Sequence, residues 1–299
     1  MSRVPQHPVQ GFVGALAAVG ALSMMDAVMK HLVLVLGIVA VCIWRSVANL
    51  SLSALLYLPQ RLPWPSRRTL RIHVGRGVII SLMIFLFFWG IGRIPLAQAI
   101  ALTFIAPLLA LLLASAVLDE RIGQRSVIGS AVAFAGVIVI VAGQARQELG
   151  PDAMLGAVAI IGSALCYAVN IVMMRQQALA AGPFEINFFQ SLTVMACFLL
   201  ALPVMGLPVL PDGQWPWIAI AALLSTSGTL LFAWSYARGE ASYLAVTEYS
   251  AFIWASALGW IVFHERVSPY TLAGAVLIVG GCLVAARRKA EPPEIEVAA

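Results

Sequence analysis

The hydrophobic and polar positions of this 299-residue chain are arranged in long blocks. Apolar runs of about 17 to 25 residues alternate with short polar breaks, and runs of that length fit helices that cross roughly 30 Å of hydrocarbon. The pattern predicts ten such helices, over residues 9–29, 35–58, 73–92, 95–118, 125–142, 152–174, 184–204, 215–237, 240–263 and 269–286. We therefore expect an all-α membrane protein in which almost no residues remain for a soluble domain.

The second half of the chain repeats the first half at a constant offset of 145 positions. At this offset similar residues coincide without a gap: Lys30 with Arg175, Ser46 with Ser191, Pro63 with Pro208, Trp89 with Trp234 and Arg93 with Arg238. Each copy holds five predicted spans, and an odd number means that the second copy enters the membrane from the opposite side. The pattern thus predicts two inverted five-helix repeats, over 9–142 and 152–286, with a disordered tail over 287–299.

The chain is 62% hydrophobic and 10% charged, with a formal net charge of +5. With ten spans both termini lie on one side, and that side carries twelve of the Lys and Arg residues that flank the spans, against four on the opposite side. This bias predicts cytoplasmic termini and a multi-pass protein of the cell inner membrane. The basic side chains then face anionic lipid headgroups, so no nucleic-acid partner is expected.

Enzyme chemistry has little support in the sequence. The four cysteines fall inside predicted spans at unrelated spacings, the four histidines are scattered, and no Walker pattern for ATP binding is present. We therefore expect no cofactor, no metal and no catalytic residues. An intramembrane enzyme and a purely structural membrane protein remain as alternatives of a different class.

The most specific motif closes each repeat. A Glu-Arg pair at the membrane edge is followed after about eight residues by a glycine that opens a helix of small residues: Glu120-Arg121 with Gly129 and Gly136, and Glu265-Arg266 with Gly274 and Gly281. Together with the doubled arrangement, this motif resembles the EamA family of the drug/metabolite transporter superfamily. Arg45 and Pro107 also occupy positions that this family often fills in the same way.

The resemblance implies a secondary transporter that works by alternating access. Within the family the chain looks most like the YddG-type exporters of aromatic and other neutral amino acids, which implies a small-molecule substrate of that class. The ninth span departs from the family pattern, because Phe252 stands where the fourth span has Pro107, and Glu248 lies four residues earlier. Substrate rules from relatives are therefore open to question at this point.

Two charges at membrane depth are the leading candidates for substrate binding or coupling, because such charges are costly and mark function by default. Arg45 in the second span and Glu248 in the ninth both fall near the predicted midplane. They could clasp the carboxylate and ammonium groups of a zwitterion, take part in proton coupling, or form a structural salt bridge. Their repeat partners are Gln190 and Thr103, and a pseudo-symmetric site would bring all four together.

Aromatic and polar residues in the spans supply further candidates for a ligand cavity. Helix packing is the alternative explanation for each aromatic residue. Pro107 frees a backbone carbonyl in mid-helix and is interpreted as a hinge or a packing kink. The remaining candidates for substrate contact are Gln98, Asn170, Trp89, Tyr167, Tyr249 and Trp254.

Three other charged or titratable residues have simpler interpretations. Asp26 and Lys30 are one helical turn apart and are predicted to pair at the interface, with titration of Asp26 during transport as the alternative. His73 begins the third span and is interpreted as an interface residue before a proton relay. The small residues of the fifth and tenth spans predict close helix contact, either between repeats or in a homo-oligomer.

The sequence thus predicts a secondary transporter that exports a neutral or aromatic amino acid. The rival within transport is a carrier of a phosphorylated or nucleotide-linked metabolite, or of a drug. A phosphorylated substrate would need several cationic groups in the cavity, and Arg45 is the one that the pattern places clearly at depth. The coupling ion, the net direction and the oligomeric state are left open.

Overall fold

The computed structural model describes residues 8–61, 64–106, 108–109, 113, 124–144, 152–178, 180–236 and 247–286. This part of the chain is α-helical throughout, as predicted, with one short 3₁₀ turn at Leu58–Gln60. Its ten α-helices are α1 (Pro8–Leu36), α2 (Ile38–Tyr57), α3 (Arg67–Ile91), α4 (Leu96–Thr103), α6 (Gln124–Gln144), α7 (Ala153–Ala178), α8 (Pro183–Met205), α9 (Trp215–Tyr236), α11 (Ser250–Phe263) and α12 (Pro269–Ala286).

Six of the described helices are long and apolar enough to cross a membrane, namely α1, α2, α3, α7, α8 and α9. Three shorter apolar helices lie within 127–143, 250–263 and 269–281. The predicted fourth and ninth spans are described only in part, since α4 ends at Thr103 and α11 begins at Ser250. Most of the remainder of those two spans lies outside the described residues. The chain is accordingly a multi-pass membrane protein.

Local sequence sets several helix ends. Gly37 has a φ of 77° between α1 and α2, a left-handed conformation that glycine adopts without a steric penalty. Ser66 accepts a hydrogen bond from the Thr69 N–H at 3.2 Å and so caps the start of α3. Ser268 does the same for α12 through the Thr271 N–H at 3.0 Å. These caps stand at the polar breaks that separate the apolar runs.

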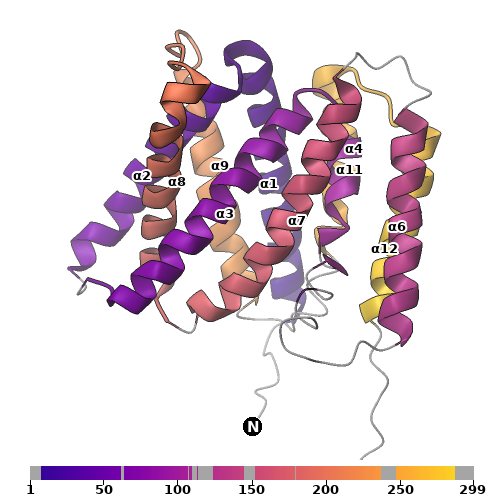
Figure 1. Cartoon of the computed structure of the whole chain (residues 1–299), viewed down its shortest axis with the longest axis horizontal. Helices are drawn as coiled ribbons and strands as arrows, with labels where there is room; N and C mark the ends of the chain where they lie inside the picture. The colour runs from indigo at the N-terminus through magenta and orange to yellow at the C-terminus, as the bar shows by residue number, and fades with distance from the viewer. Residues whose placement is uncertain are drawn as a thin grey trace, which may run out of the picture.

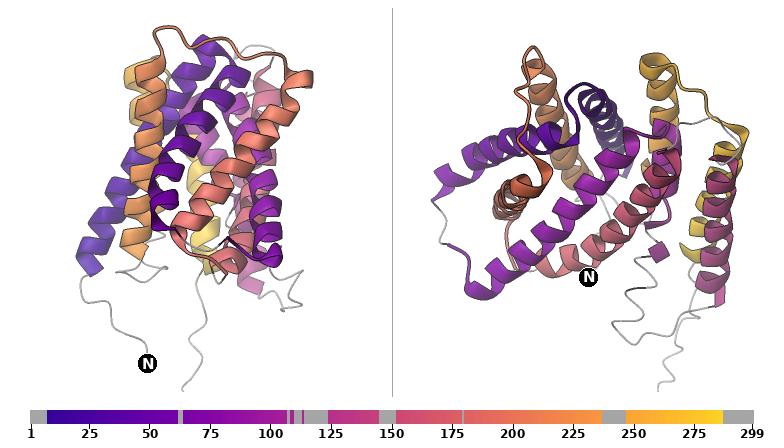
Figure 2. Two further views of the ribbon diagram at one scale, coloured as in Figure 1. Left: turned by 90° about the vertical axis from the view of Figure 1, so that its left-hand side faces the viewer. Right: turned by 45° about the horizontal axis from the view of Figure 1, so that its top comes forward.

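The helices of the two halves pack against each other in matched pairs. α1 lies along α9, and α7 lies along α3; an offset of 145 residues converts one pair into the other. α2 contacts α8, α4 contacts α11 and α6 contacts α12, each its own counterpart. Figure 1 places α2 and α8 on one side of the bundle, with α6 and α12 on the other. The views in Figure 2 show that the long helices share one general direction.

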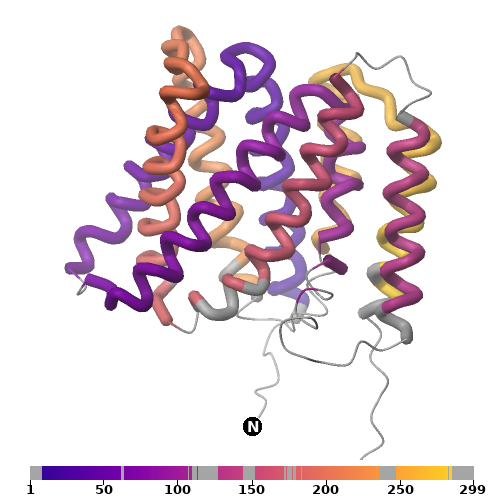
Figure 3. The backbone as a smooth tube through the Cα atoms, viewed as in Figure 1, coloured from indigo at the N-terminus to yellow at the C-terminus, as the bar shows by residue number. Residues whose placement is uncertain are grey.

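The core lies where α4 is enclosed by its neighbours. Every residue of α4 from Leu96 to Leu102 is buried, and the main core joins aliphatic and small residues of α1, α3, α4, α7 and α12. α6 and α12 run alongside each other over their whole length in Figure 3. The backbones approach closely there, since a Cβ added at Gly136 would lie 2.6 Å from the Gly274 carbonyl oxygen. This is the small-residue contact that the sequence predicts for the fifth and tenth spans.

Candidate functional site

Two helices break at equivalent positions in the centre of the bundle. α4 ends at Thr103, and α11 begins two residues after Glu248, which is the repeat partner of Thr103. The next residues, Phe104 and Tyr249, are also 145 apart, and their rings meet edge to face with centroids 5.4 Å apart. The two breaks therefore lie next to each other.

The backbone at both breaks leaves the α-helical pattern. The N–H of Phe104 donates to Ala101 O at 3.3 Å, and that of Phe252 donates to Tyr249 O at 3.3 Å, both i to i+3 contacts. Pro107 explains the first break, because proline has no N–H to offer the carbonyl four residues earlier. Pro107 itself lies outside the described residues, so its role as a hinge stays a prediction. Broken helices at membrane depth are tolerated where they line a cavity or where a neighbour satisfies the free backbone groups.

Glu248 and Tyr167 bring polar chemistry to this centre. Glu248 is half-buried and interacts electrostatically with Tyr167 of α7. Tyr167 also interacts with Arg76 of α3, so its hydroxyl lies between an acidic and a basic group. Although it stands in mid-helix, Tyr167 keeps 38% of its surface exposed. An accessible tyrosine between opposite charges is suited to contact a polar ligand.

Arg45 is a buried cation with an unused donor. It lies seven residues into α2, about 10 Å from the end of the helix next to α1. Its guanidinium stands over the Phe88 ring at 5.2 Å and interacts electrostatically with Asp26 of α1. Its Nε has no hydrogen-bond partner among the described residues. Since a buried unsatisfied donor is costly, this N–H is available to a ligand acceptor.

A second buried arginine was not singled out by the sequence, although it lies inside the predicted span 73–92. Arg76 is nine residues into α3, about 14 Å from its start. Its Nε donates to Asn170 Oδ1 at 2.7 Å, and its Nη1 donates to Gln177 Oε1. Asn170 and Gln177 both lie on α7 and are buried. The signal that could have found Arg76 is the presence of a charge within an apolar run.

The hydrogen bonds continue from Gln177 to one end of the bundle. Gln177 Nε2 bonds His73 Nδ1, and His73 Nε2 lies 3.1 Å from Glu185 Oε1 of α8. His73 is fully buried and stacks on Phe189, with centroids 5.2 Å apart and planes at 10°. The prediction that His73 is an interface residue is therefore wrong, since its ring is enclosed by three helices.

The opposite end of the bundle is closed by an ion pair between the halves. Lys30 of α1 bonds Glu265, which follows α11, and also donates to Ile94 O at 2.7 Å. The other oxygen of Glu265 accepts the Leu96 N–H at 2.8 Å, at the start of α4. Lys30 is 3% exposed, so the predicted interfacial pair between Asp26 and Lys30 is wrong. Lys30 pairs with Glu265, and Asp26 interacts with Arg45.

The other predicted site residues are distributed over several elements. Gln98 is buried on α4, Thr103 donates its hydroxyl to Ile100 O at 2.7 Å, and Gln190 is half-buried on α8 beside Phe189. Trp89 lies in the last turn of α3 beneath the Arg93 guanidinium at 3.5 Å, so it belongs to the end of the bundle. Trp254 of α11 lies against Gly20 of α1. Thr103, Glu248 and Tyr249 are thus brought together, whereas Trp89 and Trp254 lie elsewhere.

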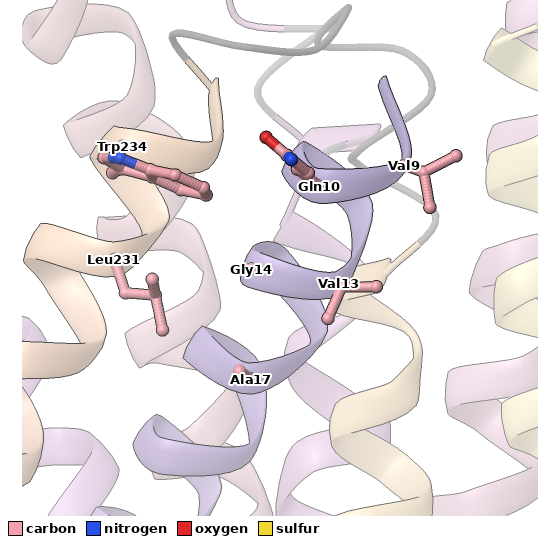
Figure 4. Close-up of a pocket in the computed structure, with 7 residues that line it drawn as sticks. All are labelled: Val9, Gln10, Val13, Gly14, Ala17, Leu231 and Trp234. Carbon is pink, nitrogen blue, oxygen red and sulfur yellow. The ribbon is translucent and has the colours of Figure 1, made fainter. Parts of the chain in front are cut away.

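An apolar groove of about 420 Å³ opens between α1 and α9. Figure 4 shows Gly14 and Ala17 on the α1 side, with Trp234 and Leu231 facing them from α9. Gln10 is the one polar side chain in the lining, and no charged group contributes to it. The groove lacks the groups that would orient a zwitterion, so the polar centre between the helix breaks is the better candidate site.

Comparison with known families decides the class of protein. A model described as the EamA-like transporter family matches the chain twice, over residues 9–142 and 154–287. The chain belongs to the EamA-like transporter family. It is therefore a membrane transporter and not an enzyme, and the doubled match agrees with the internal duplication found in the sequence.

The relatives within the EamA family carry different cargoes. The chain is 27% identical to the pseudopaline exporter CntI of Pseudomonas aeruginosa, over 93% of this chain and 96% of that protein. It is 23% identical to a riboflavin transporter of Vibrio cholerae, over 92% of each protein. It is 27% identical to the aromatic amino acid exporter YddG of Ancylobacter novellus, over 75% of this chain and 77% of that one.

A solved crystal structure shares the fold. It superposes with a TM-score of 0.59 at 21% sequence identity, and the match covers 93% of this chain and 97% of the other. Small-molecule transport is thus common to the family, while the cargo differs among the named relatives.

Proposed function

We propose that this chain exports a neutral or aromatic amino acid across the inner membrane by alternating access. The scaffold would have ten spans in two inverted repeats, 9–142 and 152–286, with both termini in the cytoplasm. The matched helix pairs support this topology, because each contact between the halves has a counterpart 145 residues away. The substrate would bind between the halves, where transporters of this construction place their sites.

One observation carries the proposal: the helix breaks at Thr103 and Glu248 lie next to each other, near side chains that can recognise a zwitterion. The unused Nε of Arg45 can donate to a carboxylate, and Glu248 can accept from an ammonium group. Phe104 and Tyr249 offer aromatic surface between them. The relative named as an aromatic amino acid exporter supports the same substrate class.

Reconstituted protein provides the test. In proteoliposomes, saturable flux of labelled phenylalanine should fall about 10- to 100-fold in Arg45→Gln, since a charged hydrogen bond contributes about 1.5–3 kcal/mol. Glu248→Gln should lose flux as well. Arg93→Gln is the matched control, because that guanidinium stacks on Trp89 at the end of the bundle and should leave flux unchanged.

The contrary result is equally clear. If no amino acid in a panel gives flux above that of empty vesicles, the substrate assignment is wrong while the fold stands. If phenylalanine flux is normal in both variants, the binding role of Arg45 and Glu248 is wrong. An imposed pH gradient in the same vesicles tests proton coupling.

A phosphorylated or nucleotide-linked metabolite is the second candidate, and Arg76 is the observation that favours it. The sequence pattern placed only Arg45 clearly at depth, whereas the structure buries a second guanidinium among neutral amides of α7. Two buried cations could offset the charge of a phosphate. Flux of a sugar phosphate that exceeds phenylalanine flux would favour this alternative.

A further inference from the structure

A chain of buried hydrogen bonds joins Arg76 to Glu185 across three helices. It runs from Arg76 of α3 to Gln177 of α7, back to His73 of α3, and then to Glu185 of α8. Arg76 also contacts Asn170, which faces it from α7. Arg76 is about 14 Å inside the bundle, while the Glu185 side chain is 14% exposed at its end. The chain thus links the interior to the edge of the membrane.

This network belongs to one half of the molecule only. The positions 145 residues away from His73, Arg76 and Glu185 hold Ile218, Ala221 and Ala40, and those of Asn170 and Gln177 hold Met25 and Leu32. All five equivalents are buried apolar residues. The duplicated scaffold therefore packs at these positions without any polar group. Since buried polar networks seldom add net stability over well-packed apolar residues, the network calls for a functional explanation.

The direction of the hydrogen bonds fixes the state of His73. A guanidinium can only donate, so Arg76 requires the oxygen of the Gln177 amide. The Gln177 NH₂ group must then point at His73 Nδ1, which has to accept. The ring proton is left on Nε2, where it donates to Glu185. While Arg76 holds Gln177, His73 is neutral, because a proton on Nδ1 would face the NH₂ group.

We propose that Arg76 is a carboxylate-binding station whose occupancy is linked, through Gln177, to protonation of His73. A substrate carboxylate that takes the Nη1 donor of Arg76 releases the Gln177 oxygen. The amide then rotates and presents that oxygen to His73 Nδ1, which takes one proton from cytoplasmic water and donates it to Gln177. This inference rests on the proposed function, because it assumes a substrate that carries a carboxylate.

The exchange keeps the charge of the network balanced. Before binding, the Arg76 cation and the Glu185 anion are separated by two neutral groups. After binding, the substrate carboxylate compensates Arg76, and the His73 cation compensates Glu185. One negative and one positive charge enter together, so no net charge is added to a low-dielectric region, where uncompensated charge is costly.

Few other described charges face His73. Tyr57 of α2 packs on Phe189 and interacts with Glu185 at the same end of the bundle. Tyr167 of α7 reaches Arg76 from the side of Glu248. On α1, Asp26 is engaged by Arg45 and Lys30 by Glu265, and the residues of α4 from Leu96 to Leu102 carry no charge.

Binding affinity as a function of pH tests the linkage. With protein in nanodiscs, the Kd of phenylalanine should fall by up to about tenfold per pH unit as the solution is acidified from pH 8 towards pH 5, where imidazole titrates. Arg76→Gln should weaken binding and flatten the pH dependence. A pH-independent Kd in the wild-type protein would overturn the proposal.

Two variants separate the linkage from simple electrostatics. Gln177→Met keeps both Arg76 and His73 but removes the amide between them, and it should abolish the pH dependence. A profile in Gln177→Met that matches the wild type would overturn the role of the amide. His73→Gln should also be flat, whereas His264→Gln, an exposed histidine at the opposite end, should keep the wild-type profile.

A spectroscopic readout does not depend on transport. Nitrogen NMR of the labelled imidazole should show His73 as the Nε2–H form at pH 8, and excess acetate should convert it to the protonated form. Arg76→Gln and Gln177→Met should remove the effect of acetate. If no amino acid binds but acetate still acts, the proposed function fails while the linkage stands; a His73 signal that ignores acetate in the wild type overturns the linkage.

Discussion

At the scale of single residues, the buried charges differ in how completely they are compensated. Lys30 has a carboxylate and a carbonyl oxygen as partners. Arg76 has two neutral amides. Arg45 has the ring of Phe88, a nearby carboxylate and an unused Nε. A compensated pair is suited to hold the structure together, whereas an incompletely satisfied cation is suited to bind an anion.

The Lys30–Glu265 pair should therefore behave as a structural element. Glu265→Gln leaves the Lys30 cation buried without its counter-charge and should destabilise the protein by about 3–5 kcal/mol. Lys30→Met should cost a similar amount, and the double variant should recover most of the loss. Thermal unfolding in detergent micelles measures this. Arg266→Gln, at an exposed neighbouring position, should change little, and additive losses in the double variant would show that the pair is not coupled.

At the scale of elements, the breaks in α4 and α11 and the seam between α6 and α12 use different chemistry. The breaks stop two apolar helices at equivalent positions, so that backbone groups and polar side chains meet inside the bundle. The seam joins two uninterrupted helices through glycines whose backbones touch. We expect the breaks to tolerate movement and the seam to resist it, because close packing leaves no room for adjustment.

The seam gives a sharp comparison between two glycines. Gly136→Ala would place a methyl group 2.6 Å from the Gly274 carbonyl oxygen and should destabilise the protein by about 1–3 kcal/mol. Gly280 lies in the same pair of helices with nothing within 4 Å of an added Cβ, so Gly280→Ala should change stability by no more than about 0.5 kcal/mol. Thermal unfolding of the two variants side by side decides the point. Equal stabilities would mean that the seam is looser than described.

At the scale of the whole molecule, α1 begins and α12 ends at the same end of the bundle (Figure 1). The same view places the end of α2 there, whereas α8 and α9 connect at the opposite end. The buried network of His73 and Gln177 lies towards the first end and the Lys30–Glu265 pair at the second. The two ends of the transport path therefore carry different polar chemistry, although the halves are related by duplication.

Thiol labelling of intact cells tests the proposed orientation. In a background with the four native cysteines replaced by alanine, Asp212→Cys, which is exposed between α8 and α9, should react with a membrane-impermeant maleimide. Gln60→Cys, exposed at the end of α2, should react only after the membrane is permeabilised. Labelling of Gln60→Cys in intact cells, with Asp212→Cys protected, would reverse the assignment of the cytoplasmic side.

The sequence by itself determined the class of the molecule. Most described helices begin and end within a few residues of the predicted spans, because the thickness of hydrocarbon fixes the length of an apolar run. The family resemblance was confirmed by the doubled EamA match. The duplication also pointed to Thr103 and Glu248 as partners, since a constant offset carries one break onto the other.

Only the tertiary structure decided which charges meet. Lys30 and Glu265 are 235 residues apart, and no local spacing could prefer that contact over Asp26, one turn away. Arg76 and His73 were passed over because their partners lie on α7 and α8, whose facing sides depend on how the helices rotate against one another. Local pattern sets which segments enter the membrane, whereas the pairing of polar groups depends on packing between segments distant in the chain.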